Sequence, residues 1–439
     1  IVYVYATHGY LLANFLNPAR NTRSDEYGGS LVNRVRLVRE LIEETKDAVG
    51  ADCAVAVRFA ADQNIGESGS PIHGERHEMF EMLAELPDLW DINIADYSVE
   101  MGVSRFTREA ALEPYMDFVN SATTKPVVTV GRFTSPETMV SQIKRGVTDL
   151  IGAARPSIAD PFLPSKIETG DLGAIRECIR CNVCYSGDSI GVPIRCTQNP
   201  TMGEEWRKGW HPEKMNTKGK SENVLVVGAG PAGLEAARAL SLRGYDVAIA
   251  EAGTELGGRV SRERLLPGLS AWGRVADYRT YQIGQRANVE TYFDSRLSAD
   301  EILEFGFQNV AIATGAKWRR DGVARQHVVP VKIDSNMAIY SPDDLMSGKI
   351  PQGKVVVYDD DHYYMGGVLA ELLARNGANV TLVTPSAYVS DWTNNTLEQG
   401  AIHRRLVDVG VEIVLNRGVT EIGADHVITN RSYTGATKP

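Results

Sequence analysis

Four cysteines gathered in one short segment constrain the fold of this chain more than any other feature. Cys178, Cys181 and Cys184 recur at every third position, and Cys196 follows further along. Thiolates are the soft ligands that iron–sulfur clusters need, and four of them complete a [4Fe–4S] site. A structural zinc also takes four cysteines, but usually as two pairs with a longer spacer between them. The spacing therefore favours a [4Fe–4S] cluster over zinc, and a disulfide framework is less favoured again.

The bulk composition is that of a globular protein with more than one domain. A length of 439 residues allows two or three domains, each with its own core. The formal charge of −10 gives no reason to expect nucleic acid or an anionic membrane as a partner. No apolar run approaches a membrane span, and free thiols destined for a cluster indicate the reducing cytoplasm. Because the chain opens inside an apparent strand at Ile1 and closes at Pro439 without a terminating helix, we expect a fragment.

Residues 1–170 alternate apolar strands with amphipathic helices. Strands are expected at Ile1–Tyr5, Cys53–Phe59, Leu89–Ile94, Pro126–Val130 and Asp149–Ala153. The clearest helix is Leu31–Val49, where apolar residues recur at helical spacing behind a Ser30 N-cap. Repeated strand–helix units predict a parallel sheet. Since no helix here opens with a glycine-rich phosphate loop, the α/β pattern fits the C-terminal part of a (β/α)8 barrel better than a doubly wound sheet.

Polar or glycine residues follow each of these strands, which is where the chemistry of such barrels is found. The first strand end supplies Tyr5 and His8, and the second supplies Arg58, which could hold the negative charge of a reduced flavin ring. The fourth strand end supplies Gly131 and Arg132, which suit a phosphate because the glycine lets the backbone come close and the arginine can make two hydrogen bonds to it. A single strand-end arginine is most often a surface ion pair, but five polar ends at one barrel mouth favour an active site. The candidate cofactor-binding residues of the barrel are Arg58, Gly131, Arg132, Ala154 and Arg155.

Residues 221–345 carry the complete fingerprint of a dinucleotide-binding Rossmann domain. The strand at Val224 runs into Gly228, Gly230 and Gly233, and Glu251 stands at the end of the second strand. The glycines permit the turn and close phosphate approach, the helix N-terminus faces the phosphate, and the acid binds the ribose. We therefore expect nucleotide binding, in a domain that resembles the ADP- or FAD-binding part of glutathione reductase-type proteins.

Residues 346–439 begin a second strand–turn–helix unit, in the place where reductases carry NAD(P)H. Its turn has Asp359, Asp360 and Asp361 where the early glycines are expected. Three carboxylates would repel a pyrophosphate, and their side chains would block the approach of the backbone. The sequence therefore predicts a degenerate NAD-type insert that does not bind NAD(P)H.

Two sets of motifs resemble the trimethylamine, dimethylamine and histamine dehydrogenases, a branch of the old yellow enzyme family of FMN barrels. The barrel signature comprises Asn17-Pro18, Asn21, Arg23, Asp25, Tyr27-Gly28-Gly29-Ser30 and Asn33-Arg34. The branch motifs are Tyr5-Ala6-Thr7-His8, Trp90-Asp91-Ile92, Val130-Gly131-Arg132, the run from Ala154 to Phe162, and the four cysteines. The resemblance implies FMN in the barrel, one [4Fe–4S] cluster in residues 171–220, and a tightly held ADP in the next domain.

The same resemblance distinguishes the catalytic residues. Ene-reductases of the wider family place His or Asn at the first strand end, whereas the amine dehydrogenases have Tyr-x-x-His, as Tyr5 and His8 supply. Amine oxidation needs the neutral amine, and a Tyr–His pair can accept the proton or fix the nitrogen. Family members usually add an Asp beside this His. Here that loop is shorter, and Glu100 is the candidate partner.

The predicted function is that of an iron–sulfur flavoprotein oxidising a small amine, either a secondary or tertiary methylamine or a histamine-like one. The resemblance implies hydride transfer to FMN, then single electrons through the cluster to an external acceptor such as electron-transferring flavoprotein, in a homo-oligomer. The aromatic cage of trimethylamine enzymes is missing, and Tyr10 and Asp188 are the candidate substrate residues. Arg274 replaces a surface Tyr of the family, so acceptor docking is expected to differ.

Two alternatives remain from the sequence. The first is an NAD(P)H-dependent enoate or 2,4-dienoyl-CoA reductase, in which Tyr10 would donate a proton to a substrate carbon. The second is a non-catalytic electron carrier or redox-responsive adapter. Reduction of the flavin by NADPH or by an amine would distinguish the enzymes, and turnover of any amine would exclude the carrier.

Overall fold

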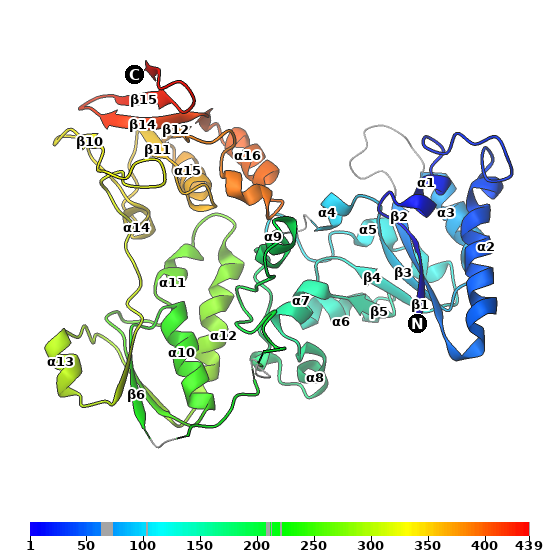
Figure 1. Cartoon of the computed structure of the whole chain (residues 1–439), viewed down its shortest axis with the longest axis horizontal. Helices are drawn as coiled ribbons and strands as arrows, with labels where there is room; N and C mark the ends of the chain where they lie inside the picture. Colours follow the sequence, from blue (N-terminus) through cyan, green and yellow to red (C-terminus); the bar gives the residue numbers. More distant parts are fainter. Residues whose placement is uncertain (63–72, 102–103, 208–210, 212, 220–221, 439) are drawn as a thin grey trace. The chain divides into compact units, whose positions relative to one another are not determined.

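The computed structural model describes residues 1–62, 73–101, 104–207, 211, 213–219 and 222–438 (Figure 1). The chain forms two compact units, Ile1–Pro161 and Phe162–Pro439. Among the helices in these described ranges, none combines the length and the apolar character needed to cross a membrane.

The first unit is built on one five-stranded parallel sheet (Figure 1). Its strands, in sheet order and in chain order, are β1 (Val2–Ala6), β2 (Val55–Asp62), β3 (Leu89–Ile94), β4 (Val127–Val130) and β5 (Leu150–Gly152). Its helices are α1 (Leu11–Leu16), α2 (Leu31–Val49), α3 (His73–Leu83), α4 (Tyr97–Met101), α5 (Glu113–Met116), α6 (Pro136–Lys144) and α7 (Ala154–Ala159). The predicted parallel sheet is confirmed. The predicted second strand began two residues too early, and it continues past Phe59 to Asp62.

Helix α2 has the bounds that the sequence predicts. Its N-cap is Ser30, whose hydroxyl accepts a hydrogen bond from the Asn33 N–H at 3.3 Å. Such a cap is worth about 1 kcal/mol. Gly50 follows the last turn with a φ of +63°, a left-handed conformation that favours glycine. Val35, Val38 and Ile42 lie on one face of the helix and are fully buried in the core against the sheet.

An aromatic cluster fixes β2 and β3 against the surrounding helices. Trp90 is fully buried, with its ring 5.8 Å from that of Phe59 and 4.6 Å from that of Phe80. Its indole N–H donates to the Ala84 carbonyl at 2.9 Å. Because successive residues of a strand face opposite sides, burying Phe59 and Trp90 on one face leaves Arg58 and Asp91 on the other. The packing of the core therefore determines which side chains are available for chemistry.

The second unit begins with α8 (Leu163–Glu168), the cysteine segment and α9 (Val183–Ser189). A four-stranded parallel sheet follows in the order β8-β7-β6-β9. Its strands are β6 (Asn223–Val227), β7 (Asp246–Ala250), β8 (Val289–Tyr292) and β9 (Asn309–Ile312), with helices α10 (Pro231–Leu242), α11 (Arg259–Glu263), α12 (Arg274–Gly284) and α13 (Ala299–Glu304). The chain leaves β6 toward β7 and later returns to its other side as β9. This switch point is where doubly wound sheets bind nucleotides.

The remainder of the second unit forms two small sheets. The parallel sheet holds β11 (Lys354–Tyr358), β12 (Asn379–Val383) and β13 (Glu412–Val414), and confirms the predicted second strand–turn–helix unit. The other sheet has the order β10-β14-β15-β16, with β10 (Lys332–Ile333), β14 (Arg417–Ile422), β15 (Val427–Arg431) and β16 (Thr437–Lys438). The helices are α14 (Pro342–Met346), α15 (Met365–Arg375) and α16 (Gln399–Asp408).

Candidate active site and cofactor sites

Three adjacent strands present a polar row on the face opposite the aromatic cluster. In the sheet register, Tyr5 of β1 is paired with Arg58 of β2, which in turn is paired with Asp91 of β3. The Arg58 guanidinium lies 5.8 Å from the centre of the Tyr5 ring and 3.8 Å from Asp91 Oδ2. Parallel pairing thus places residues that are far apart in sequence side by side on one face of the sheet.

Tyr5, His8 and Glu100 form a continuous chain of hydrogen bonds. The Tyr5 hydroxyl lies 2.7 Å from His8 Nδ1, and His8 Nε2 lies 2.9 Å from Glu100 Oε2. An ionised carboxylate only accepts, so His8 donates to Glu100 when Nε2 carries a proton, and Nδ1 can then accept from the Tyr5 hydroxyl. The side chains of His8 and Glu100 are 3% and 12% exposed, whereas Tyr5 is 37% exposed. The chain therefore runs from an accessible phenol to a carboxylate that is largely shielded from water.

Arg58 contacts the carboxylate end of this chain. Its NH2 donates to Glu100 Oε1 at 3.2 Å, so the two oxygens of Glu100 serve Arg58 and His8 separately. Burial raises the pKa of Tyr5, an effect that Arg58 opposes and Glu100 reinforces. Burial likewise raises the pKa of Asp91, again against the effect of Arg58. The phenol of Tyr5 is therefore protonated at neutral pH and can donate to His8.

Asp91 of the branch motif Trp90-Asp91-Ile92 and Tyr97, which follows the third strand, lie at this site together with Asn93, which the sequence analysis did not single out. The amide nitrogen of Asn93 lies 3.0 Å from His8 Nε2, and its oxygen accepts the Thr7 hydroxyl at 2.9 Å. The ring of Tyr97 packs edge-on against His8 with centroids 4.9 Å apart. A signal for Asp91 and Asn93 was present, because polar residues inside an otherwise apolar strand need a partner when buried.

The predicted substrate residues are both exposed. Tyr10 is 63% exposed, and its ring lies 5.6 Å from that of Tyr5. Asp188 lies on α9 in the second unit and is exposed. Its role toward a substrate remains a prediction.

The residues after β4 and β5 are the predicted phosphate-binding residues, and the backbone there is closely packed or in a left-handed conformation. A Cβ on Gly131 would lie 3.1 Å from the Phe133 ring and 3.4 Å from Ala110. Arg132 is in the left-handed region with a φ of +59°, and its NH1 donates to the Ser104 carbonyl at 3.2 Å. Ala154 and Arg155 open α7 directly after β5, with Ala154 exposed and Arg155 half-buried. These four predicted residues follow the last two strands of the sheet, where barrels of this type bind phosphates.

Glu109 accepts hydrogen bonds from the loop that carries Gly131 and Arg132. Its carboxylate accepts hydrogen bonds from the N–H groups of Thr134 and Ser135 at 3.1 and 3.2 Å, and from both of their hydroxyls. The neighbouring Ala110 N–H donates to the Gly131 carbonyl at 2.8 Å. Burial alone would raise the pKa of Glu109, but these hydrogen bonds outweigh it and lower the pKa. The 104–110 loop and the 131–135 loop are therefore joined by a set of short polar contacts.

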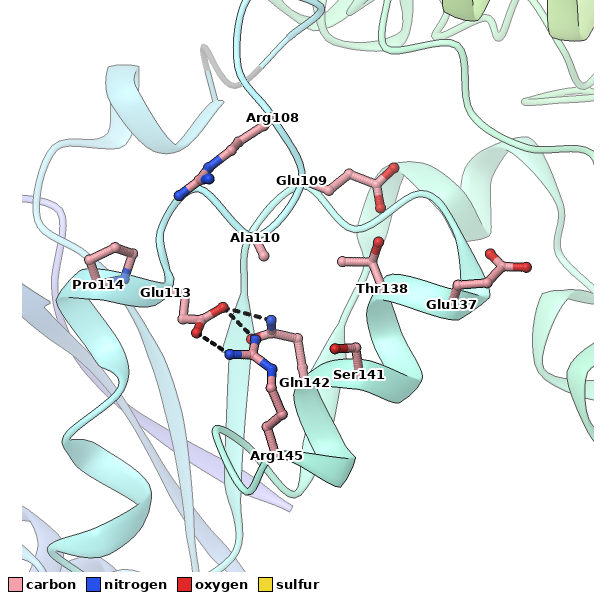
Figure 2. Close-up of a pocket in the computed structure, with 10 residues that line it drawn as sticks. All are labelled: Arg108, Glu109, Ala110, Glu113, Pro114, Glu137, Thr138, Ser141, Gln142 and Arg145. Carbon is pink, nitrogen blue, oxygen red and sulfur yellow. Dashed lines mark hydrogen bonds and ion pairs between the residues drawn. The ribbon is translucent and has the colours of Figure 1, made fainter.

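A groove of about 540 Å³ lies on the other side of this contact, between the loop at 108–114 and α6 (Figure 2). Inside it, Glu113 accepts two hydrogen bonds from Arg145 at 2.7 Å and one from Gln142 at 2.8 Å. None of the predicted site residues lines the groove. The groove is therefore separate from the Tyr5–His8–Glu100 chain of hydrogen bonds.

The cysteine segment turns back on itself so that backbone N–H groups face sulfur. The N–H groups of Arg180 and Gln198 donate to Cys178 Sγ and Cys196 Sγ, each at 3.4 Å. Arg180 and Asn182, between the first three cysteines, have φ values of +65° and +52°, which bend the chain tightly there. Burial raises the pKa of Cys181 to about 12, and the nearby thiols of Cys178 and Cys196 add to this effect.

The donor set fits an iron–sulfur cluster. All four cysteines are half-buried and outside any disulfide, and N–H groups directed at sulfur are the hydrogen bonds that tune such clusters. In the described part of the chain, no group of three or more His, Cys, Asp or Glu residues is arranged to hold a single metal ion.

The glycine fingerprint at β6 is required by close packing at two of its three positions. A Cβ on Gly228 would lie 2.5 Å from the Ala313 carbonyl oxygen, and one on Gly233 would lie 1.9 Å from that of Gly228. A Cβ on Gly230 would meet nothing within 4 Å. Glu251 Oε2 accepts the Ala229 N–H and Oε1 accepts the Gly253 N–H, both at 2.7 Å. The open space at Gly230 and the adjacent carboxylate fit a nucleotide lying over this turn.

The corresponding turn after β11 is filled by its own side chains. Asp359 and Asp360 are 2% and 5% exposed. A Cβ on Gly366 would lie 2.5 Å from Asp359 Cγ, so the Asp359 carboxylate occupies the space between the turn and α15. Burial raises the pKa of Asp359 to about 6. Asp360 Oδ1 lies 3.1 Å from His362 Nε2, and this contact raises the pKa of His362.

Comparison with known proteins matches separate segments of the chain to three family models. Residues 1–172 match the NADH:flavin oxidoreductase / NADH oxidase family, residues 226–294 match an NAD(P)-binding Rossmann-like domain, and residues 340–436 match the OYE-like second alpha/beta domain. The first match identifies the unit that carries Tyr5, His8 and Arg58 as an FMN barrel.

Individual relatives extend the match over the whole chain. Dimethylamine dehydrogenase from Hyphomicrobium sp. (strain x) is 40% identical over 99% of this chain. The structure of histamine dehydrogenase from Rhizobium sp. 4-9 is 61% identical with a TM-score of 0.95 over 99% of the chain, and that of 6-hydroxypseudooxynicotine amine oxidase from Pseudomonas geniculata N1 is 49% identical with a TM-score of 0.92 over 100%. The chain spans 62%, 64% and 66% of these three proteins, respectively. Over almost its whole length, the chain is therefore similar to dimethylamine and histamine dehydrogenases.

Proposed function

We propose that the protein to which this chain belongs is an iron–sulfur flavoprotein that oxidises a small amine. The observation that carries this proposal is the chain of hydrogen bonds from Tyr5 through His8 to Glu100. Small aliphatic amines are protonated at neutral pH, and a protonated nitrogen has no lone pair to assist loss of hydride from its α-carbon. A site for this reaction must first remove that proton and then hold it away from the nitrogen.

The residues of the barrel divide this task by position. Tyr5 is exposed enough to meet the amine, and its protonated hydroxyl can relay a proton to His8. Glu100 would stabilise the imidazolium that results, because a carboxylate 2.9 Å from Nε2 makes a charge-assisted hydrogen bond. Arg58 fixes the orientation of Glu100 through its second oxygen.

The barrel residues also fit FMN. Arg58 Nε is buried and has no hydrogen-bond partner among the described residues, so it can donate to the flavin ring. Gly131, Arg132, Ala154 and Arg155 would hold the phosphate. FMN supplies the hydride acceptor of the reaction when it is bound.

The second unit would hold the remaining cofactors. Cys178, Cys181, Cys184 and Cys196 would hold one [4Fe–4S] cluster, which supplies one-electron transfer to an acceptor outside the chain. Gly228, Gly230, Gly233 and Glu251 would bind ADP, or FAD, in a fold of the glutathione reductase type. The proposed boundaries are 1–170 for the barrel, 171–220 for the cluster segment, 221–345 for the ADP domain and 346–439 for the NAD-type insert.

The substrate class follows from the relatives and from two exposed side chains. The solved relative at 61% identity is a histamine dehydrogenase, whereas the dimethylamine dehydrogenase is 40% identical. A carboxylate such as Asp188 would suit an amine that carries a second polar or cationic group, and Tyr10 is the candidate substrate residue of the barrel. We therefore infer a histamine-like amine, an electron-transferring flavoprotein as acceptor, a homo-oligomer and, because a cluster needs reduced cysteines, a reducing cytoplasm.

The test is anaerobic reduction of the flavin in the full-length protein by a panel of amines and by NADPH. We expect an amine to bleach the flavin absorbance and NADPH alone to leave it unchanged, because Asp359 fills the turn that would receive the pyrophosphate. Rapid bleaching by NADPH without any amine would contradict the proposal and favour the enoate or dienoyl-CoA reductase.

A further inference from the structure

Three arginines are buried beside the cysteine segment of the second unit. Arg176, Arg238 and Arg279 are 0%, 0% and 4% exposed. Arg176 precedes Cys178 by two residues, Arg238 lies on α10 and Arg279 lies on α12. Burying like charges together is costly unless each is paired and hydrogen-bonded. Their contacts therefore indicate what the arrangement is for.

Two carboxylates near the cysteine segment each form ion pairs with two cationic side chains. Glu235 pairs with Arg238 at 2.6 Å and with Arg279 at 2.8 Å. Glu213 pairs with Arg176 at 3.1 Å and with Lys166 at 3.0 Å, and Arg176 also donates to the Tyr278 hydroxyl at 3.0 Å. Within this set of residues, positive charge is in excess.

Arg279 reaches one end of the cysteine segment through a buried glutamine. Its NH1 donates to Gln198 Oε1 at 3.0 Å and its NH2 donates to the Gln198 carbonyl at 3.2 Å. Gln198 is 1% exposed, and its own N–H donates to Cys196 Sγ. Its side-chain nitrogen donates to the Glu177 carbonyl at 3.0 Å. A single glutamine thus connects Cys196 to the residue that precedes Cys178.

Arg274, at the start of α12, reaches the other end. Its NH1 donates to the Cys178 carbonyl at 2.9 Å, and its Nε pairs with Glu177 Oε2 at 2.6 Å. The two arginines of α12 therefore contact the first and the last cysteine residues of the set, one directly and one through Gln198.

We propose that α12 positions the [4Fe–4S] cluster and raises its reduction potential, with Arg279 acting through Gln198 and Arg274 acting at Cys178. This inference rests on the proposed cluster. Reduction adds an electron to a centre that four thiolates already make negative, so nearby positive charge and N–H groups aimed at sulfur stabilise the reduced form. Both arginines are positioning residues, because the contacts described above join them to the cysteine backbone and its neighbours.

The test uses the full-length holoprotein and an electron paramagnetic resonance-monitored redox titration of the cluster. Arg279→Gln removes the charge, whereas Arg279→Lys keeps it and loses the paired contacts with Gln198. We expect a lower midpoint potential for Arg279→Gln than for wild type, an intermediate value for Arg279→Lys, and a lowered value for Arg274→Gln. The matched control is Arg264→Gln, which removes a guanidinium bound to Asp277 of the same helix at 2.6 and 2.8 Å. Its potential should equal that of wild type.

The outcomes separate the inference from the proposed function. An Arg279→Gln protein with full iron and sulfide content and an unchanged potential would overturn the inference. If that variant loses its cluster or fails to fold, Arg274→Gln decides, because its side chain is already 24% exposed and its loss leaves the buried network intact. A wild-type protein without iron would refute the proposed cluster itself.

Discussion

Replacing Glu100 with glutamine tests the proposed proton relay most directly. Glu100 uses one oxygen for His8 and the other for Arg58, at 2.9 and 3.2 Å. A glutamine has one acceptor oxygen and can serve only one of these donors, so the other donor would face an amide NH2. Leaving a largely buried donor unsatisfied costs about 1–3 kcal/mol, and the charge-assisted bond to a protonated His8 is lost as well. Proton transfer from the amine should become about 10- to 100-fold less favourable, since about 1.4 kcal/mol is a tenfold change.

The assay is the anaerobic rate of flavin reduction by the amine that works best in the panel, followed by stopped-flow absorbance. We expect the rate of Glu100→Gln at neutral pH to fall by about 10- to 100-fold with the flavin content unchanged. The control is Glu113→Gln, which removes another carboxylate of the first unit that is bound by an arginine and a glutamine, but in the groove. A rate for Glu100→Gln within twofold of wild type, with normal flavin content, would refute the relay.

Three further changes test the core, the filled turn and the nucleotide fingerprint. Trp90→Ala should lower the free energy of unfolding by about 3–5 kcal/mol, measured by urea denaturation, whereas Trp206→Ala, at a site 78% exposed, should leave it nearly unchanged; equal effects would contradict the packing described. The pKa of Asp359 is raised from 3.8 to about 6, so the stability linked to its protonated form is present below pH 3.8 and is lost as the pH rises through 6. Between pH 4 and pH 8, the free energy of unfolding of wild type should therefore fall by up to about 3 kcal/mol, whereas that of Asp359→Asn should not show this fall. An equally steep decline of the free energy of unfolding in both proteins would contradict this role of Asp359. Gly230→Ala should fold but lose bound nucleotide, measured by chromatography after heat release, whereas Gly233→Ala should fail to fold, because its Cβ would lie 1.9 Å from a carbonyl oxygen; retention of nucleotide by Gly230→Ala would contradict the assignment.

The sequence predicted most of the regular structure because the signals are local. Helix α2 was predicted to the residue, since Ser30 caps it and Gly50 ends it within the same stretch of chain. The strand at Leu89–Ile94 was also predicted with its bounds. The glycine fingerprint predicted the strand–turn–helix at β6, and close packing at short range requires glycine at Gly228 and Gly233.

The contacts of the site were less accessible from sequence. Tyr5, His8 and Glu100 were chosen as catalytic residues, but the sequence could not show that Glu100 approaches His8 across the sheet or that Arg58 shares its carboxylate. These contacts depend on the register of β1, β2 and β3 and on the path of the loop after β3. The role of Asn93 was missed for the same reason, since its partner His8 lies in the turn after β1, far away in sequence.

The contacts of Glu109 have a consequence for engineering the specificity of this barrel. Its carboxylate accepts hydrogen bonds from the N–H groups of Thr134 and Ser135, the two residues before α6, and the adjacent Ala110 N–H donates to the Gly131 carbonyl. Replacing residues 104–110 with those of a relative would therefore disturb the proposed phosphate-binding residues Gly131 and Arg132, unless residues 131–135 were replaced as well. Because these contacts join residues 104–110 to residues 131–135, mutant libraries that change one segment should change the other at the same time.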